Sequence, residues 1–156
     1  MKLLVGVDLS ESTEKIIKKA EQIAKALSAK VWILHVTRPM PTDIYLAGQE
    51  TDSIGYETDP QLLRDSLAKR FHNEHRQTQE IADRLRNSGL DATALLVEGE
   101  AADSILKEAS DLDVDIIIVG SHGRGAMYQL LMGSVSKGVL HRSERPILVV
   151  PTHQRS

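Results

Sequence analysis

Cysteine is absent from this 156-residue sequence, and so are a basic balance of charge and long apolar runs. Without cysteine there is no disulfide, no thiolate metal ligand and no cysteine nucleophile. A formal net charge of −3 argues against sequence-independent binding of nucleic acid, which requires a basic surface. No run approaches the roughly 20 apolar residues of a membrane span, and the N-terminus lacks the features of a signal peptide. These absences predict a cytoplasmic protein with no nucleic-acid or membrane partner.

The remaining composition is that of an ordinary globular protein, with 41% hydrophobic and 26% charged residues. The length suffices for one domain with a sizeable core. Because no internal repeat, low-complexity segment or boundary interrupts the sequence, we expect residues 1–156 to form a single domain.

Five apolar runs alternate with four helical patterns along the chain. Continuous apolar runs are typical of strands that are buried on both faces of a parallel sheet. A strand, a helix and a second strand form a βαβ unit, which requires parallel pairing and a right-handed crossover. The alternation therefore predicts a doubly wound α/β sandwich of five parallel strands. We expect the strand order 3-2-1-4-5, one of the common orders of this class. The expected strands are Leu3–Val7, Val31–Val36, Asp91–Val97, Val114–Val119 and Ile147–Val150.

The helical patterns also predict which side chains face the core. In the first helix the expected apolar positions are Ile16, Ile17, Ala20, Ile23, Ala24 and Leu27. In the long helix over 61–87 they are Leu63, Leu67, Phe71, Thr78, Ile81, Ala82 and Leu85. In the helix over 134–141 they are Val135, Val139 and Leu140.

The segment 38–60 interrupts this alternation with three prolines and two glycines. A loop of this length inside a compact domain is usually functional or mobile. Two interpretations remain open: a disordered surface insertion, or a lid over a binding site.

The last strand, Ile147–Val150, is bracketed by prolines and follows a short crossover, which places it at one margin of the sheet. It contains no charged residue, and an apolar strand with a free edge is prone to unwanted pairing. We therefore expect this edge to pair with its copy in a homodimer. The alternative is that Arg145 and the tail from Thr152 onward shield it.

A glycine-rich stretch, 120–125, follows the fourth strand, and Gly133-Ser134-Val135-Ser136 opens the last helix. Glycine lets a backbone approach a ligand closely, and a helix N-terminus presents unpaired N–H groups with partial positive charge. In doubly wound sheets, ligands lie beyond the carboxyl ends of the strands where the strand order reverses. We therefore expect Asp8, at the end of the first strand, to converge with residues 120–123 on one crevice.

Two common nucleotide motifs are missing. There is no Gly-x-x-x-x-Gly-Lys-Ser/Thr sequence, so the stretch is not a P-loop. The first strand–helix turn lacks the three glycines of a dinucleotide fingerprint, and Gly123-Arg124-Gly125 has Tyr128 in place of the third glycine.

The spacing Gly120-x-x-Gly123, nine residues, then Gly133-Ser134 resembles the nucleotide-binding signature of the universal stress protein family. The resemblance extends over essentially the whole chain, from Val5-Gly6-Val7-Asp8-Leu9-Ser10 through Leu34-His35-Val36 to Arg145-Pro146-Ile147-Leu148-Val149-Val150. It implies a Rossmann-like sandwich of the adenine nucleotide alpha hydrolase type. Because the glycine pattern is carried by the ATP-binding branch of the family, it also implies a site for ATP or AMP. Gly6 is a small departure, since many members have proline or alanine there.

Carried over position by position, the resemblance gives each end of the nucleotide its partners. Asp8 would accept hydrogen bonds from ribose hydroxyls, Val36 would border adenine, and the start of the last helix would wrap the phosphates. His122 and Arg124 are phosphate candidates whose alternative is to face solvent. Mg²⁺ would arrive only with a triphosphate. The implied binding residues are Val7, Asp8, Val36, Val119, Gly120, His122, Gly123, Arg124, Gly133, Ser134, Val135 and Ser136.

Simpler roles compete with these. Asp8 and Ser134 are each able to serve as helix caps, and His35 is expected to be a packing residue at a strand end. His72 and His75 share one face of a helix, but no third ligand accompanies them, so we expect a solvated face and no metal site.

Catalysis on nucleotides requires a positioned base, an activating lysine or paired carboxylates for a metal. Around the glycine motif the sequence offers Asp8 as the one carboxylate and Lys137 as the one lysine. The prediction is a regulatory, nucleotide-binding protein of the stress response with an unknown regulated partner, and not an enzyme. Two alternatives remain: a slow ATPase or nucleotidyl-transfer enzyme that draws Asp43 or Asp52 from the 38–60 loop, and a dimerisation module with an empty site.

Overall fold

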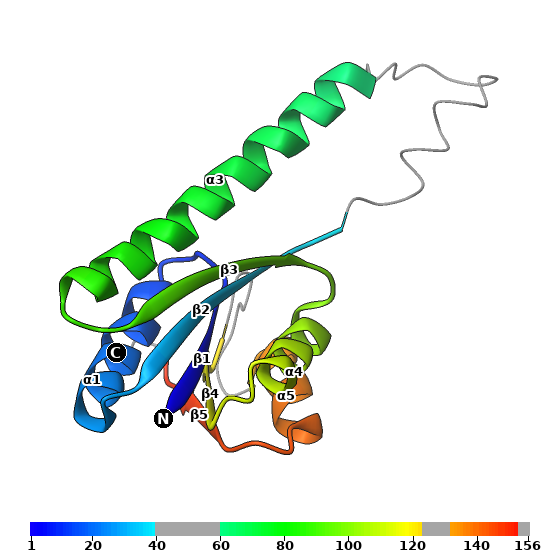
Figure 1. The fold of residues 1–156 in the computed structure, drawn as a ribbon. Helices are drawn as coiled ribbons and strands as arrows, with labels where there is room; N and C mark the ends of the chain where they lie inside the picture. Colours follow the sequence, from blue (N-terminus) through cyan, green and yellow to red (C-terminus); the bar gives the residue numbers. More distant parts are fainter. Residues whose placement is uncertain (40–59, 123–131, 153–156) are drawn as a thin grey trace, which may run out of the picture.

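A computed structural model describes residues 1–39, 60–122 and 132–152, and it has three layers, with a parallel sheet between two layers of helices (Figure 1). Within these residues the sheet has five strands in the order β3-β2-β1-β4-β5, which confirms the predicted order. The strands are β1 (Lys2–Val7), β2 (Lys30–Thr37), β3 (Ala92–Glu98), β4 (Ile116–Gly120) and β5 (Ile147–Val150). The helices are α1 (Thr13–Leu27), α3 (Pro60–Asn87), α4 (Ala101–Asp111) and α5 (Ser134–Arg142).

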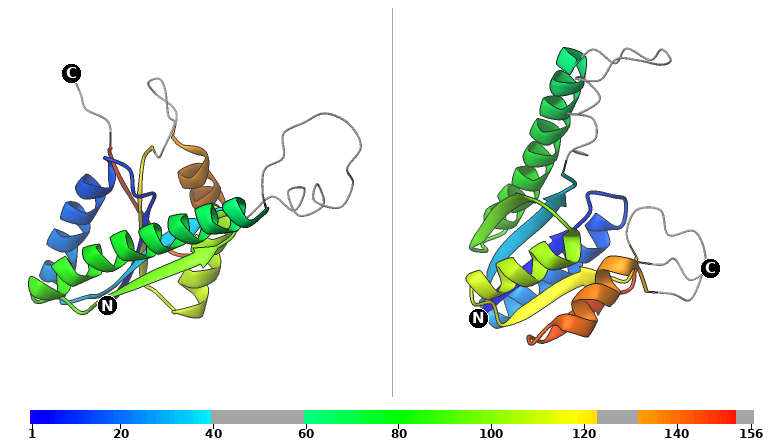
Figure 2. Two further views of the ribbon diagram at one scale, coloured as in Figure 1. Left: turned by 90° about the horizontal axis from the view of Figure 1, so that it is seen from above. Right: turned by 90° about the vertical axis from the view of Figure 1, so that its right-hand side faces the viewer.

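Each face of the sheet has its own apolar core, and Figure 2 shows the helices on both sides. Side chains alternate between the two faces of a strand. In β1, Leu3 and Val5 therefore belong to the core under α1 and α3, whereas Leu4 belongs to the core under α4 and α5. All three are fully buried. Burial on both faces explains why the strands are continuously apolar in sequence.

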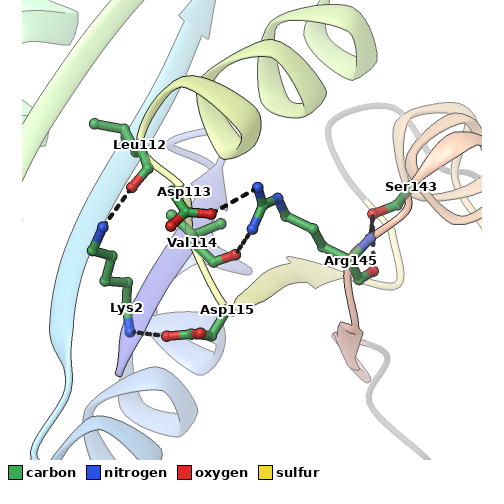
Figure 3. A network of polar contacts seen from close by, with 7 residues as sticks. All are labelled: Lys2, Leu112, Asp113, Val114, Asp115, Ser143 and Arg145. Carbon is green, nitrogen blue, oxygen red and sulfur yellow. Dashed lines mark hydrogen bonds and ion pairs between the residues drawn. The ribbon is translucent and has the colours of Figure 1, made fainter.

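The ends of the strands opposite the candidate site are joined by a polar network (Figure 3). The backbone N–H of Lys2 donates to Oδ2 of Asp115 at 2.7 Å, and the Lys2 ammonium donates to the carbonyl of Leu112 at 3.1 Å. These bonds join the start of β1 to the turn that precedes β4. They keep the two central strands aligned at that end.

Arg145, which precedes β5, belongs to the same network. Its guanidinium donates to the carbonyl of Val114 and, at 3.1 Å, to Oδ1 of Asp113 (Figure 3). Both partners precede β4, the inner neighbour of β5. These bonds of Arg145 therefore lie on the inner side of β5, and residues 153–156, the rest of the tail in the shielding alternative, lie outside the described residues.

The apolar stripe predicted along α3 is only half correct. Thr78, Ile81, Ala82 and Leu85 are buried, but Phe71 is 45% exposed. The 28 residues of α3 span about 42 Å, whereas the eight residues of β2 span only about 26 Å. The N-terminal half of α3 therefore stands away from the sheet (Figure 1).

Two further leucines that were expected in the core are exposed. Leu27 is 42% exposed and Leu140 is 49% exposed, because both lie in the last turn of a helix. Within the described ranges, no helix combines the length and the apolar character needed to cross a membrane.

Candidate functional site

The strand order reverses at β1. From β1 the chain continues to β2 and β3 on one side, while β4 and β5 lie on the other. Leu3 pairs with Ile116 and Val5 with Ile118. If this register is extended toward the carboxyl ends of the two strands, Asp8 is level with Ser121. Asp8 and the start of the glycine stretch thus follow two neighbouring strands at the same edge of the sheet. Gly123 and Arg124, predicted for the same site, lie outside the described residues.

Asp8 is held in place by the turn that it organises. Its Oδ1 accepts hydrogen bonds from the backbone N–H of Ser10 at 3.1 Å and from the Ser10 hydroxyl at 2.6 Å, with the Thr13 hydroxyl at 3.4 Å. Between them, Leu9 has φ of 57°, a left-handed conformation that is unfavourable for a residue with a branched side chain. Such strain persists where the surroundings enforce it, often at functional sites. The half-buried carboxylate is therefore fixed in position before a ligand arrives.

The competing role of Asp8 as a helix cap is not what the structure shows. The N-cap of α1 is Ser12, which makes no capping bond through its side chain. Ser134 is likewise not a cap, because the N-cap of α5 is Gly133 and Ser134 is the first helical residue. Neither residue is therefore the N-cap of the helix that follows it.

Gly120 ends β4 in a narrow space. A Cβ atom at this position would lie 2.8 Å from Cδ1 of Ile16 and 2.9 Å from Cγ2 of Thr152, closer than real contacts allow. The Gly120 carbonyl accepts a hydrogen bond of 2.5 Å from the hydroxyl of Ser136, which is 4% exposed. Ser136, predicted to wrap the phosphates, thus uses its hydroxyl hydrogen to bind the end of β4.

The start of α5 is tied directly to the glycine stretch. The N–H of Gly133 donates to the carbonyl of Ser121 at 2.8 Å. The first amides of a helix have no acceptor within it and carry partial positive charge. Gly133 has no side chain that could cap these amides. The first-turn amides of α5 include those of Ser134 and Val135, and the bond from Gly133 to Ser121 sets them next to the carboxyl end of β4. This geometry favours an anion.

The four valines predicted for the site belong to two different cores. Val36, Val119 and Val135 lie in the core under α4 and α5, and Val36 and Val135 are only half-buried there. Val7 belongs to the opposite core under α1 and α3. The apolar surface available to a base on the side of α4 and α5 therefore includes that of Val36 and Val135.

His35 packs at the end of β2, as predicted, but it also joins two elements. Its ring is 7% exposed, and Nδ1 lies 2.9 Å from the carbonyl of Val7. Because a carbonyl only accepts, Nδ1 carries the hydrogen. The other ring nitrogen, Nε2, lies 3.7 Å from Oε2 of Glu74 on α3. His35 thus contacts both α3, through Glu74, and the end of β1, through Val7.

A groove of about 510 Å³ also lies beside Asp8, between the β1–α1 turn and α3. Four carboxylates line it, with Arg84 as the one cation among its lining residues. A phosphate group would meet net negative charge there, so the α5 side of Asp8 suits an anion better. The carboxylates are Glu11, Glu14, Glu80 and Asp83.

His72 and His75 are both exposed. Across the described part of the chain, no three His, Cys, Asp or Glu side chains are grouped so as to hold a metal ion. Asp43 and Asp52, proposed for the slow-ATPase alternative, lie outside the described residues.

Sequence reasoning missed two residues of this region. Ser121 lies inside the glycine stretch and joins β5 to the start of α5. Its N–H donates to the carbonyl of Val150 at 2.8 Å, and its carbonyl accepts from the N–H of Gly133. Thr152 follows β5, and its side chain contacts Ser121 and His122. The position of Ser121 in the motif was a usable signal, whereas nothing in the sequence marks Thr152.

The parallel sheet, whose strand order reverses between β1 and β4, makes this chain a doubly wound α/β protein, a class in which ligands bind at the switch point. The family model agrees with this class. The chain belongs to the universal stress protein family, whose model matches residues 1–151.

Individual relatives cover nearly the whole chain. It is 30% identical over 157 residues to universal stress protein MJ0577 of Methanocaldococcus jannaschii, covering 96% of this chain and 93% of that protein. It is 31% identical over 150 residues to universal stress protein YxiE of Bacillus subtilis, covering 96% and 97%.

Solved structures share the fold. The structure of MJ0577 superposes with a TM-score of 0.76 at 28% identity, covering 99% of this chain and 97% of that one. A universal stress protein solved in complex with cAMP superposes with a TM-score of 0.64 at 25% identity, covering 98% of each chain.

Proposed function

We propose that this chain binds an adenine nucleotide, ATP or AMP, and acts as a cytoplasmic regulatory protein in the stress response, and not as an enzyme. The observation that carries the proposal is the turn after β4. There Gly120 leaves no room for a side chain, and Gly133 joins the turn to the start of α5. Asp8 stands at the neighbouring strand end. The relative solved with cAMP supports an adenine nucleotide as the ligand.

The site offers a different chemistry to each part of a nucleotide. The Asp8 carboxylate, fixed by its own turn, would accept hydrogen bonds from the ribose hydroxyls. The half-buried Val36 would contact adenine. The first-turn amides of α5 and the exposed Ser134 would bind the phosphates. His122, at the turn itself, is a further candidate, and Mg²⁺ would be bound only as part of a triphosphate complex.

A binding role fits the charged groups better than hydrolysis does. Among the described residues at this end of β1 and β4, Asp8 is the one carboxylate predicted for the site, and Lys137 is exposed on α5. Two-metal or base-assisted attack on a phosphate needs more charged partners than these. Occupancy by ATP or AMP would instead change the surface that a regulated protein contacts.

We also propose that the chain forms a homodimer through β5. Ile147, Leu148 and Val149 are only half-buried, although all three are apolar. β5 is the last strand of the described sheet, and Arg145 and Thr152 both direct their side chains toward β4 and its turn. A second copy of β5 is the partner that fits this edge.

The nucleotide proposal is tested by denaturing the purified protein and identifying any released ATP, ADP or AMP by chromatography. Titration calorimetry of the stripped protein with ATP and with AMP then gives the affinities. We expect near-stoichiometric release and tight binding. The Asp8→Asn variant should bind at least tenfold more weakly. Each hydrogen bond that a hydroxyl donates to a carboxylate contributes about 1.5–3 kcal/mol to the binding free energy.

Asp91→Asn is the matched control, because Asp91 is an exposed carboxylate at the other end of the sheet. It should bind as the wild type does. A stripped wild-type protein that shows no affinity for either nucleotide would refute the proposal. Rapid, steady turnover of added ATP would instead favour the enzyme alternative.

A further inference from the structure

We propose that Thr152 is a positioning residue of the nucleotide site, which fastens the turn at Ser121 and His122 to the end of β5. The inference rests on the proposed nucleotide function and deepens it, because it makes the outer strand of the sheet part of the site's support.

The Thr152 hydroxyl contacts both polar main-chain groups of His122. The N–H of His122 donates to Oγ1 of Thr152 at 3.2 Å, and Oγ1 donates to the carbonyl of His122 at 3.3 Å. The Ser121 hydroxyl lies 3.2 Å from the same Oγ1. One hydroxyl has a single hydrogen and two lone pairs, so these three contacts use all of its capacity.

The main chain of Thr152 strengthens the attachment. Its N–H donates to the hydroxyl of Ser121 at 3.1 Å, and its carbonyl accepts a bond of 3.1 Å from the Lys15 ammonium on α1. The N–H of Ser121 in turn donates to the carbonyl of Val150 at 2.8 Å. The turn after β4 and the residues after β5 are therefore joined through side chains and main chain alike.

The methyl group of Thr152 has a separate role. Its Cγ2 occupies the space into which a Cβ of Gly120 would project, at 2.9 Å. The glycine that the nucleotide site requires thus leaves a gap, and Thr152 fills it from one side while Ile16 fills it from the other. A threonine serves both purposes, whereas serine lacks the methyl group and valine lacks the hydroxyl.

Fixing this turn matters because ordering a loop on binding reduces affinity. A turn held at Ser121 and His122 by these bonds is in position before the nucleotide arrives. Because the anchor follows β5 directly, whatever orders the end of β5 also orders the turn. By linkage, a bound nucleotide must then order the end of β5 to the same extent.

The test compares Thr152→Val, which keeps the shape, with Thr152→Ser, which keeps the hydroxyl. Nucleotide affinity is measured by calorimetry with AMP and with ATP, and the Tm is measured without nucleotide. We expect Thr152→Val to weaken binding by about tenfold, the equivalent of about 1.4 kcal/mol. Thr152→Ser should stay within about threefold of wild type, as expected where methyl packing contributes less than the hydrogen bonds. Thr93→Val, a change of the same kind on β3, is the matched control and should bind normally.

Hydrogen exchange distinguishes a local change at the turn from a loss of stability of the whole domain. In Thr152→Val the amide of His122 should exchange faster while the core amides of β1 and β2 stay protected. The inference is overturned if wild type binds nucleotide and Thr152→Val binds equally well, or if Val and Ser variants lose affinity and Tm in parallel. If wild type binds neither AMP nor ATP, the proposed function itself has failed, which is a distinct result.

Discussion

At residue 120 any side chain would overlap its neighbours, because a Cβ would lie 2.8 Å from Ile16 and 2.9 Å from Thr152. Both neighbours present the ends of side chains, so they are able to move, but Thr152 is also bonded to Ser121 and His122, so a shift of Thr152 disturbs the turn that the site depends on. The constraint therefore affects the site more than the fold. Asp8 and Leu9 show the same pattern, since a strained φ of 57° is maintained to place one carboxylate.

Replacing Gly120 with valine should therefore reduce nucleotide affinity by more than tenfold while the chain still folds. Overpacking of a filled site typically costs about 1–3 kcal/mol, which is less than the stability of a typical domain. Calorimetry measures the affinity and circular dichroism the fold. Gly6→Ala is the matched control, because the nearest atom to a Cβ there, Cδ1 of Ile105, lies at 3.2 Å. Equal affinity of Gly120→Val and wild type would contradict the expectation.

Among the elements, α3 depends on a few contacts because half of it stands away from the sheet. Its buried residues are confined to the C-terminal half, and Leu62 near its start is 66% exposed. Glu74 marks the boundary, where it lies opposite His35 on β2. Oε2 of Glu74 is buried, and among the described residues it accepts no hydrogen bond. Two basic side chains face this carboxylate: Nε2 of His35 lies 3.7 Å from Oε2, and Nε of Arg70 lies 4.0 Å from Oε1.

Removing both partners should consequently cost less than the sum of the two single losses. His35→Ala leaves the Val7 carbonyl and the Glu74 carboxylate without the imidazole, at a cost of about 1–3 kcal/mol. We expect the His35→Ala, Glu74→Ala double variant to be more stable than the sum of the single losses predicts. Urea unfolding of the four proteins measures this coupling. Strictly additive losses would mean that the two side chains do not interact in solution.

For the molecule as a whole, the sequence determined the fold more completely than the site. Strand–helix alternation was sufficient for the doubly wound class, whereas the order 3-2-1-4-5, confirmed by the structure, was expected as one of the common orders of that class. The apolar run alone was sufficient for β1. Asp8 and Gly120 stood out because each follows such a run.

The residues that support the site were not predictable in this way. Thr152 contacts Ser121 across 31 positions, and Glu74 contacts His35 from another element. Such contacts depend on where two strand ends or a strand and a helix meet, and no periodicity records them. The prediction that Phe71 is buried was wrong for a related reason. The helical period shows which face of a helix is apolar but not where the sheet beneath the helix ends.

The homodimer proposed through β5 is the last expectation, and it is testable one backbone group at a time. The carbonyls of Pro146 and Val150 accept bonds from β4, so by alternation the N–H of Leu148 faces β4 and that of Val149 faces outward. Val149→Pro therefore removes an outward donor and should convert the dimer to a folded monomer in sedimentation equilibrium. Val149→Lys should do the same by placing a charge on the edge. Leu148→Pro, the control, loses an inner bond and should lower the Tm instead. A monomeric wild type, or proline and lysine variants at position 149 that remain dimeric, would show that β5 is not the interface.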